Sequence, residues 1–170
     1  VTGDLCALFA DLHGGAPVGT SGQNIAVADF VEAMYTLDNA NAAGQKRCVL
    51  HPRQVADLFV ALTGSGAIYQ NLPELVRSGV LPEGQPAAGF VGQLFGVPIY
   101  QTTEVDTANG GADRVGAMFT AEAMAFVQLR PITVEYDYDA SRRAREIVVT
   151  AAYGVCEIVD AFGVPIVTDA

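Results

Sequence analysis

The chain has 170 residues, of which 51% are apolar, and its mean hydropathy is +0.30. This composition excludes intrinsic disorder and predicts one domain with a good core, or one domain and an extension. Its 19 acidic and 9 basic residues leave a net charge of −10, which argues against direct, tight binding of nucleic acid, because such binding needs Lys and Arg to displace counterions. No apolar run approaches the roughly 18 residues of a membrane helix.

Apolar residues at helical spacing mark the first part of the chain. They predict the end of a helix over residues 1–13, stopped by Gly14 and Gly15, and a second helix over residues 28–37. Because the chain begins at Val1 inside a helical pattern, we expect further sequence upstream. We therefore expect the chain to be a processed product or a fragment.

A strand that runs directly into a helix follows. The strand is predicted over residues 47–51, and the helix begins at Pro52, whose fixed φ suits a first helical turn. That helix ends at Gly64 and places Val55, Leu58, Phe59 and Leu62 on one face. Residues 65–89 are rich in Gly and Pro, so we expect a surface excursion with at most a short helix near residues 74–77.

Short strands are predicted over residues 90–95, 98–102 and 114–119, with a turn-rich loop over residues 106–113. Together with the helices they predict an α+β core that extends to about Leu129.

Strict alternation of apolar and polar residues sets the next segment apart. It runs over residues 132–138 and places Ile132, Val134, Tyr136 and Tyr138 on one face, which we expect to be packed while the other is wet. Residues 139–144 suit a hairpin turn, and residues 145–159 form a long β-prone run interrupted only by Gly154. A final short strand is predicted over residues 164–167.

The length of this hairpin indicates its purpose. A strand over residues 145–159 would extend roughly 50 Å, whereas a compact chain of this size has a radius of gyration near 15 Å, or about 40 Å across. The strand would therefore protrude unless it bends at Gly154. Because an exposed apolar surface on a protruding part needs a partner, the sequence favours assembly.

Signatures of enzymes and metal sites are absent from the sequence. It has no phosphate-binding glycine loop, no nucleophile elbow, and only His13 and His51 as histidines. The three cysteines are widely separated, which suits buried residues in a reducing compartment. We therefore expect no catalytic, cofactor-binding or metal-binding residues, and no cofactor.

Opposite charges gather around the predicted hairpin turn. Asp137 and Asp139 could meet one cation, because residues two apart on a strand share a face. The simpler interpretation is a wet strand face whose carboxylates are balanced by arginines across the turn. We predict that this cluster makes ion pairs between subunits; its members are Asp137, Asp139, Arg142, Arg143 and Arg145.

Five segments in a fixed order then resemble the C-terminal portion of tailed-bacteriophage major capsid proteins, which have the Hong Kong 97-type fold. The segments are VADFVEAMYTL, VLHPRQVADLF, GQLFGVPIYQTTEV, GAMFTAEAMAF and ITVEYDYDASRRAREIVVTAAYGVCEIVDAFGVPIV. The resemblance covers nearly the whole chain, most convincingly from Ile25 onward. It implies an icosahedral shell subunit of the virion, assembled in the host cytoplasm as pentamers and hexamers around double-stranded DNA without sequence-specific binding. Decoration or scaffold proteins are further implied partners, and a membrane is not.

The resemblance also implies a division of the chain. Residues 1–14 would end a spine helix of the peripheral domain, residues 25–129 would form an axial domain, residues 130–160 the long peripheral strands, and residues 161–170 a strand returning to the core. The family's N-terminal arm and extended loop are absent from this sequence. Some members cross-link through a lysine on that loop and an asparagine on the long strand, but residues 145–159 contain no asparagine, so that chemistry is not carried over.

Two other hypotheses remain open at this point. The shell of a cellular nanocompartment, of the encapsulin kind, resembles the same fold and encloses an enzyme. A small α+β enzyme or binding domain could use Asp137, Asp139 and His51, which requires His51 to lie near the hairpin turn.

Overall fold

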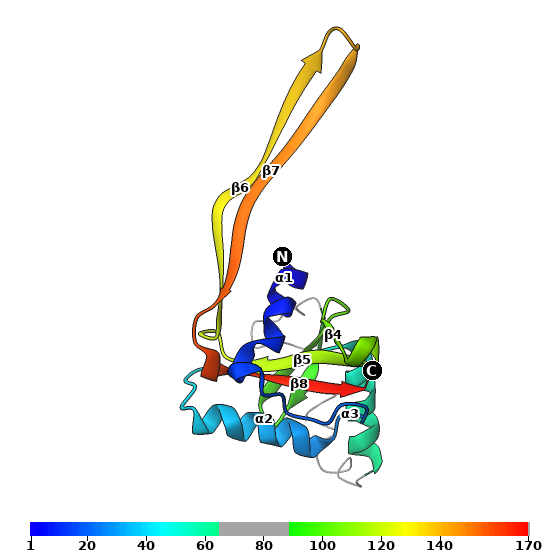
Figure 1. Ribbon diagram of the computed structural model, residues 1–170, viewed down its shortest axis with the longest axis vertical. Helices are drawn as coiled ribbons and strands as arrows, with labels where there is room; N and C mark the ends of the chain where they lie inside the picture. Colours follow the sequence, from blue (N-terminus) through cyan, green and yellow to red (C-terminus); the bar gives the residue numbers. More distant parts are fainter. Residues whose placement is uncertain (65–88, 170) are drawn as a thin grey trace.

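A six-stranded sheet with flanking helices and a projecting two-stranded hairpin make up the chain (Figure 1). The computed structural model describes residues 1–64 and 89–169. Its helical segments are α1 (Thr2–Ala7), η1 (Leu8–Ala10), η2 (Leu12–Gly15), α2 (Val27–Asn39), α3 (Pro52–Gly64), η3 (Asn109–Gly111) and η4 (Asp160–Phe162). Its strands are β1 (Arg47–Leu50), β2 (Phe90–Leu94), β3 (Val97–Gln101), β4 (Thr107–Ala108), β5 (Asp113–Phe119), β6 (Met124–Asp139), β7 (Ala144–Glu157) and β8 (Gly163–Asp169). The predicted α+β class is confirmed.

The larger sheet has the order β2-β3-β1-β5-β4, and β8 pairs with β5. The β1–β3 pair is parallel, and the other pairs are antiparallel. Gln54, which is fully buried in the first turns of α3, ties this helix to the sheet: its amide donates to the Arg114 carbonyl (3.0 Å) and to Thr168 Oγ1 (2.8 Å), while its oxygen accepts from the His51 N–H (3.0 Å). The start of α3 is thereby fixed against β5 and β8.

The two faces of this sheet are covered unequally. The larger apolar cluster lies on the side of α2 and α3 and includes Phe30 and Leu37, both fully buried, as the helical periodicity predicts. On α3, Val55, Leu58 and Leu62 are buried, but Phe59 is 36% exposed, so its predicted place on the buried face is wrong. A smaller cluster around Cys6, Phe9 and Leu12 lies on the side of α1.

The N-terminal helix ends earlier than the sequence predicts. The α-helix stops at Ala7, and tighter 3₁₀ turns carry the chain to Gly15. Three consecutive residues have positive φ, namely His13, Gly14 and Gly15. The two glycines therefore occupy the left-handed conformation expected of a helix stop, although the left-handed turn already begins at His13.

Two other expectations change in detail. The turn-rich loop over residues 106–113 contains the short strand β4 and the turn η3. The long strand β6 begins at Met124, well before residue 130. The expected surface excursion lies, except for Gly89, outside the described residues.

Candidate functional site

The hairpin of β6 and β7 exposes apolar side chains along its length. Ile132 is 70% exposed, Tyr136 75% and Ile147 60%. The expectation that one face is packed is therefore wrong for the isolated chain, because no described element lies against the outer half of the hairpin (Figure 1). A two-stranded ribbon has too few neighbours to bury its own side chains. Most of the large apolar side chains that are exposed among the described residues lie on this hairpin.

The strand register gives this hairpin two chemically different faces. Tyr136 lies opposite Ile147, and Val134 lies opposite Val149. Because side chains alternate along a strand, these four residues share one apolar face. The other face carries Asp137, which lies opposite Glu146. The outer hairpin is thus apolar on one side and acidic on the other.

The structure revises how the charges at the turn are arranged. Asp137 is not balanced by an arginine across the strand pair, since its cross-strand neighbour is Glu146, and Arg145 lies opposite Tyr138 on the other face. Asp139 pairs with Ala144 through the backbone. Arg143 adopts a left-handed backbone (φ 52°) in the exposed turn that also contains Arg142. The arginines therefore gather at the tip of the hairpin, and the predicted intersubunit ion pairs stay a prediction.

A hydrogen bond joins the inner end of the hairpin to α1. Tyr153 Oη donates to Asp4 Oδ2 at 2.7 Å, and the Phe126 and Tyr153 rings pack with centroids 5.8 Å apart. This bond holds the pKa of Asp4 below its usual value, and the bond together with the Asp4 carboxylate raises the pKa of Tyr153. The hairpin therefore leaves the domain in a direction set partly by α1. Sequence reasoning predicted the inner part of β7 as a strand but missed the inner part of β6, because Pro131 interrupts the alternation upstream of Ile132.

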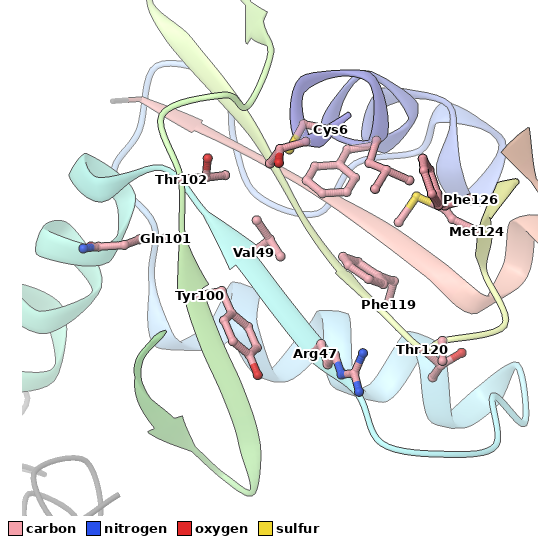
Figure 2. A pocket seen from close by; sticks show the side chains of 14 residues that line it. Cys6, Arg47, Val49, Tyr100, Gln101, Thr102, Phe119, Thr120, Met124 and Phe126 are labelled. Carbon is pink, nitrogen blue, oxygen red and sulfur yellow. The ribbon is translucent and has the colours of Figure 1, made fainter. Parts of the chain in front are cut away.

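A groove of about 380 Å³ lies between α1, the open face of the sheet and the start of β6 (Figure 2). Its lining is mostly apolar and includes Val49 from β1, Tyr100 from β3, Phe119 from β5 and Met124 from β6. The groove is built from four parts of the chain that are distant in sequence, namely α1, β1, β3 and the connection from β5 to β6. No local pattern could therefore predict it. Burial raises the pKa of Cys6 in the groove to about 11, so this thiol stays protonated near neutral pH and is a poor nucleophile.

His51 was the other candidate residue for a site at the hairpin turn. Burial and the nearby Arg114 lower the pKa of His51, whose Nδ1 accepts the Arg53 N–H at 3.2 Å. The hypothesis of a site containing Asp137 and His51 is wrong, because α3, which His51 directly precedes, and the hairpin turn lie at opposite ends of the molecule (Figure 1). In the described part of the chain, no group of three or more His, Cys, Asp or Glu could hold a metal ion. None of its helices has the length and apolar character needed to cross a bilayer.

Comparison with known proteins identifies this architecture. No protein-family model and no curated protein sequence matches the chain. Among solved structures, the capsid of the cyanophage P-SCSP1u aligns with a TM-score of 0.62 at 14% identity, over 98% of this chain and 59% of the phage chain. The head structure of the Helicobacter pylori bacteriophage KHP40 aligns with a TM-score of 0.64 at 11% identity, over 98% of this chain and 63% of the other.

The chain has the fold of tailed-phage capsid proteins. The same capsid fold occurs in the SrpI encapsulin of Synechococcus elongatus, which aligns with a TM-score of 0.58 at 15% identity, over 96% of this chain and 59% of the encapsulin. The chain thus spans less than two thirds of each of these structures. The resemblance read from the sequence is confirmed at the level of the capsid fold.

Proposed function

We propose that the chain is a structural subunit that assembles with copies of itself into a closed, capsid-like shell. The observation that carries this proposal is the projecting hairpin, whose apolar face is exposed and has no partner among the described residues. An exposed apolar surface of this extent marks a site of contact with another surface. The capsid fold of the domain supports the same conclusion.

Within this class we favour the shell of a tailed phage. Residues 25–129 would form its axial domain and residues 130–160 the long strands of its peripheral domain. Pentamers and hexamers would build the virion, formed in the host cytoplasm. The net charge of −10 suits a wall that encloses DNA without gripping it. An encapsulin-type shell is the second candidate, favoured by the likeness to SrpI.

Electron microscopy tests the shell function. The protein, expressed within its full reading frame and concentrated, should form closed particles of uniform size. Particles that contain double-stranded DNA would support the phage shell, and particles that contain one protein cargo would support the nanocompartment. A protein that stays monomeric at high concentration would contradict both.

The charged cluster at the tip of the hairpin is part of this proposal. We expect ion pairs between subunits at Asp137, Asp139, Arg142, Arg143 and Arg145. Each exposed pair contributes only about 0–1 kcal/mol, but a shell repeats it many times. Reversing both Arg142 and Arg143 to Glu should prevent or weaken assembly, and raising the salt concentration should weaken it in the unaltered protein. Unchanged assembly after the double reversal would contradict this role.

A further inference from the structure

The two outer edges of the hairpin differ in their ability to accept another strand. On β6, Pro131 lacks an N–H, and the register shifts between Gln128 and Arg130 and again between Arg130 and Thr133. Prolines and bulges of this kind protect an edge from further pairing. By contrast, β7 contains no proline from Ala144 to Glu157. Its outer edge is therefore the better template, and among the described residues β7 pairs only with β6.

The two ends of β7 carry opposite charges. Arg145 stands at its outer end, next to the turn with Arg142. At its inner end, β7 ends at Glu157 and η4 begins at Asp160, whose Oδ1 accepts the Gly14 N–H at 2.8 Å. Burial, together with the charges of Asp160 and Asp11, raises the pKa of Glu157. None of the ion pairs found among the described residues involves Glu157 or Asp160. The inner end of the hairpin therefore presents crowded carboxylates that a cation would stabilise.

We propose, on the basis of the proposed shell function, that β7 pairs with β7 of a second copy of this chain in antiparallel orientation, so that the basic tip of each hairpin lies against the acidic base of the other. The two hairpins would then form a four-stranded ribbon with twofold symmetry. From Arg145 to Glu157 the strand spans roughly 40 Å. The two domains consequently lie at opposite ends of the ribbon.

The charges select one register for this pairing. Setting Arg145 opposite the partner's Glu157 places Ala151, midway between them, opposite its own counterpart. The same register brings Arg142 toward the partner's Asp160. Shifting the strands by two residues in either direction places Arg145 opposite Val155 or Val159, and the ion pair is lost. A shift by one residue would place the apolar face of one hairpin on the same side of the four-stranded sheet as the acidic face of the other.

The uncharged residues of β7 fit this register. Val149 would lie opposite the partner's Tyr153, and Ile147 opposite the partner's Val155. Aromatic with β-branched and aliphatic with aliphatic are favourable cross-strand combinations. At present Ile147, Val149 and Tyr153 are 60%, 61% and 45% exposed. The pairing would give each of them a neighbour on the apolar face.

Disulfide trapping tests the register directly. Ala151→Cys is introduced together with Cys156→Ser, which removes the exposed native thiol; Cys6 and Cys48 are buried. Directly opposed residues in an antiparallel pair have Cα atoms about 4.5–5.5 Å apart, within reach of a disulfide. Mild oxidation should therefore yield a covalent dimer. The matched control is Val134→Cys on β6, in the same background, which should not cross-link. A missing Ala151 dimer, or equal cross-linking at Val134, would overturn the proposal.

A charge exchange tests the partners of the ion pair. Arg145→Glu and Glu157→Arg should each raise the dissociation constant of the dimer roughly 3- to 30-fold, since each change breaks two symmetry-related pairs. The double variant should restore the affinity, because the exchanged charges again attract. Sedimentation velocity measures all four proteins. A double variant that dimerises as weakly as the single variants would overturn the ion pair and with it the register.

The outcomes separate this inference from the proposed shell function. Closed particles whose Ala151→Cys subunits do not cross-link would overturn the β7 pairing while the shell function stands. A cross-linked dimer that never forms particles would support the pairing and contradict the shell function. Pairing of β7 with another segment of its own chain would appear as a monomer resistant to cross-linking, which also overturns the proposal.

Discussion

The globular domain and the hairpin are built from similar strands but treat their apolar residues in opposite ways. In β5, Val115 is 4% exposed and Ala117 is fully buried, whereas Tyr136 in β6 is 75% exposed. Alternating polarity therefore predicts an amphipathic strand without telling what covers it. The domain covers its strands with its own helices, whereas no described element covers the outer half of the hairpin. Substitutions should accordingly act on folding in the domain and on association in the hairpin.

The largest effect on stability is expected at Phe30, which is fully buried between α2 and the sheet. Phe30→Ala should lower the free energy of unfolding by about 3–5 kcal/mol, because it removes apolar contacts and leaves a cavity. Urea titration followed by circular dichroism measures the change. The control is Val31→Ala on the same helix, where the side chain is 47% exposed and a loss within about 0.5 kcal/mol is expected. Equal losses would contradict the described burial.

A smaller loss is expected at Gln54. Gln54→Leu keeps the approximate volume but leaves the His51 N–H and the Arg114 carbonyl without this partner. The cost should be about 1–3 kcal/mol, as for other unsatisfied buried groups. Gln93 provides the matched control, because its amide donates to the Gly96 carbonyl near the surface, and Gln93→Leu should cost less than about 1 kcal/mol in the same titration.

A substitution at the boundary between the globular domain and the hairpin should have a local effect. Tyr153→Phe removes the hydrogen bond to Asp4, so amide exchange in the inner part of β7 should become several-fold faster while α2 is unaffected. Because this bond lowers the pKa of Asp4, its contribution is present above the normal Asp pKa and is lost as the pH falls through the lowered value. The difference from the unaltered protein should therefore disappear in strong acid. Tyr136→Phe, at the exposed outer part, should change neither observation.

The smallest effect on stability is expected at the outer hairpin. Tyr136→Ser should change the free energy of unfolding by less than about 0.5 kcal/mol, because the side chain has few neighbours in the isolated chain. Assembly should nevertheless be reduced, as light scattering would show. Glu135→Ser, on the opposite face of the same strand, is the control for a general change in solubility. A large loss of stability from Tyr136→Ser would mean that the hairpin is covered within its own chain.

The sequence determined the parts of the fold that depend on local periodicity. It predicted α2 and α3 from the spacing of residues such as Phe30 and Leu58, and the outer hairpin from the alternation that starts at Ile132. It also placed the arginines at the turn. These features could be predicted because helical and strand periods are properties of neighbouring residues.

The tertiary structure alone decided which other segments those elements contact. It placed the parallel pair β1–β3 in the centre of the sheet, formed the groove from four distant segments, and joined Tyr153 to Asp4 across 149 positions of the sequence. It also placed Glu146 opposite Asp137, since cross-strand partners depend on the register that the turn of the hairpin sets. Contacts between distant segments leave no local pattern, which is why the sequence could predict the strand pair and its protrusion but not the contact of its inner end with α1.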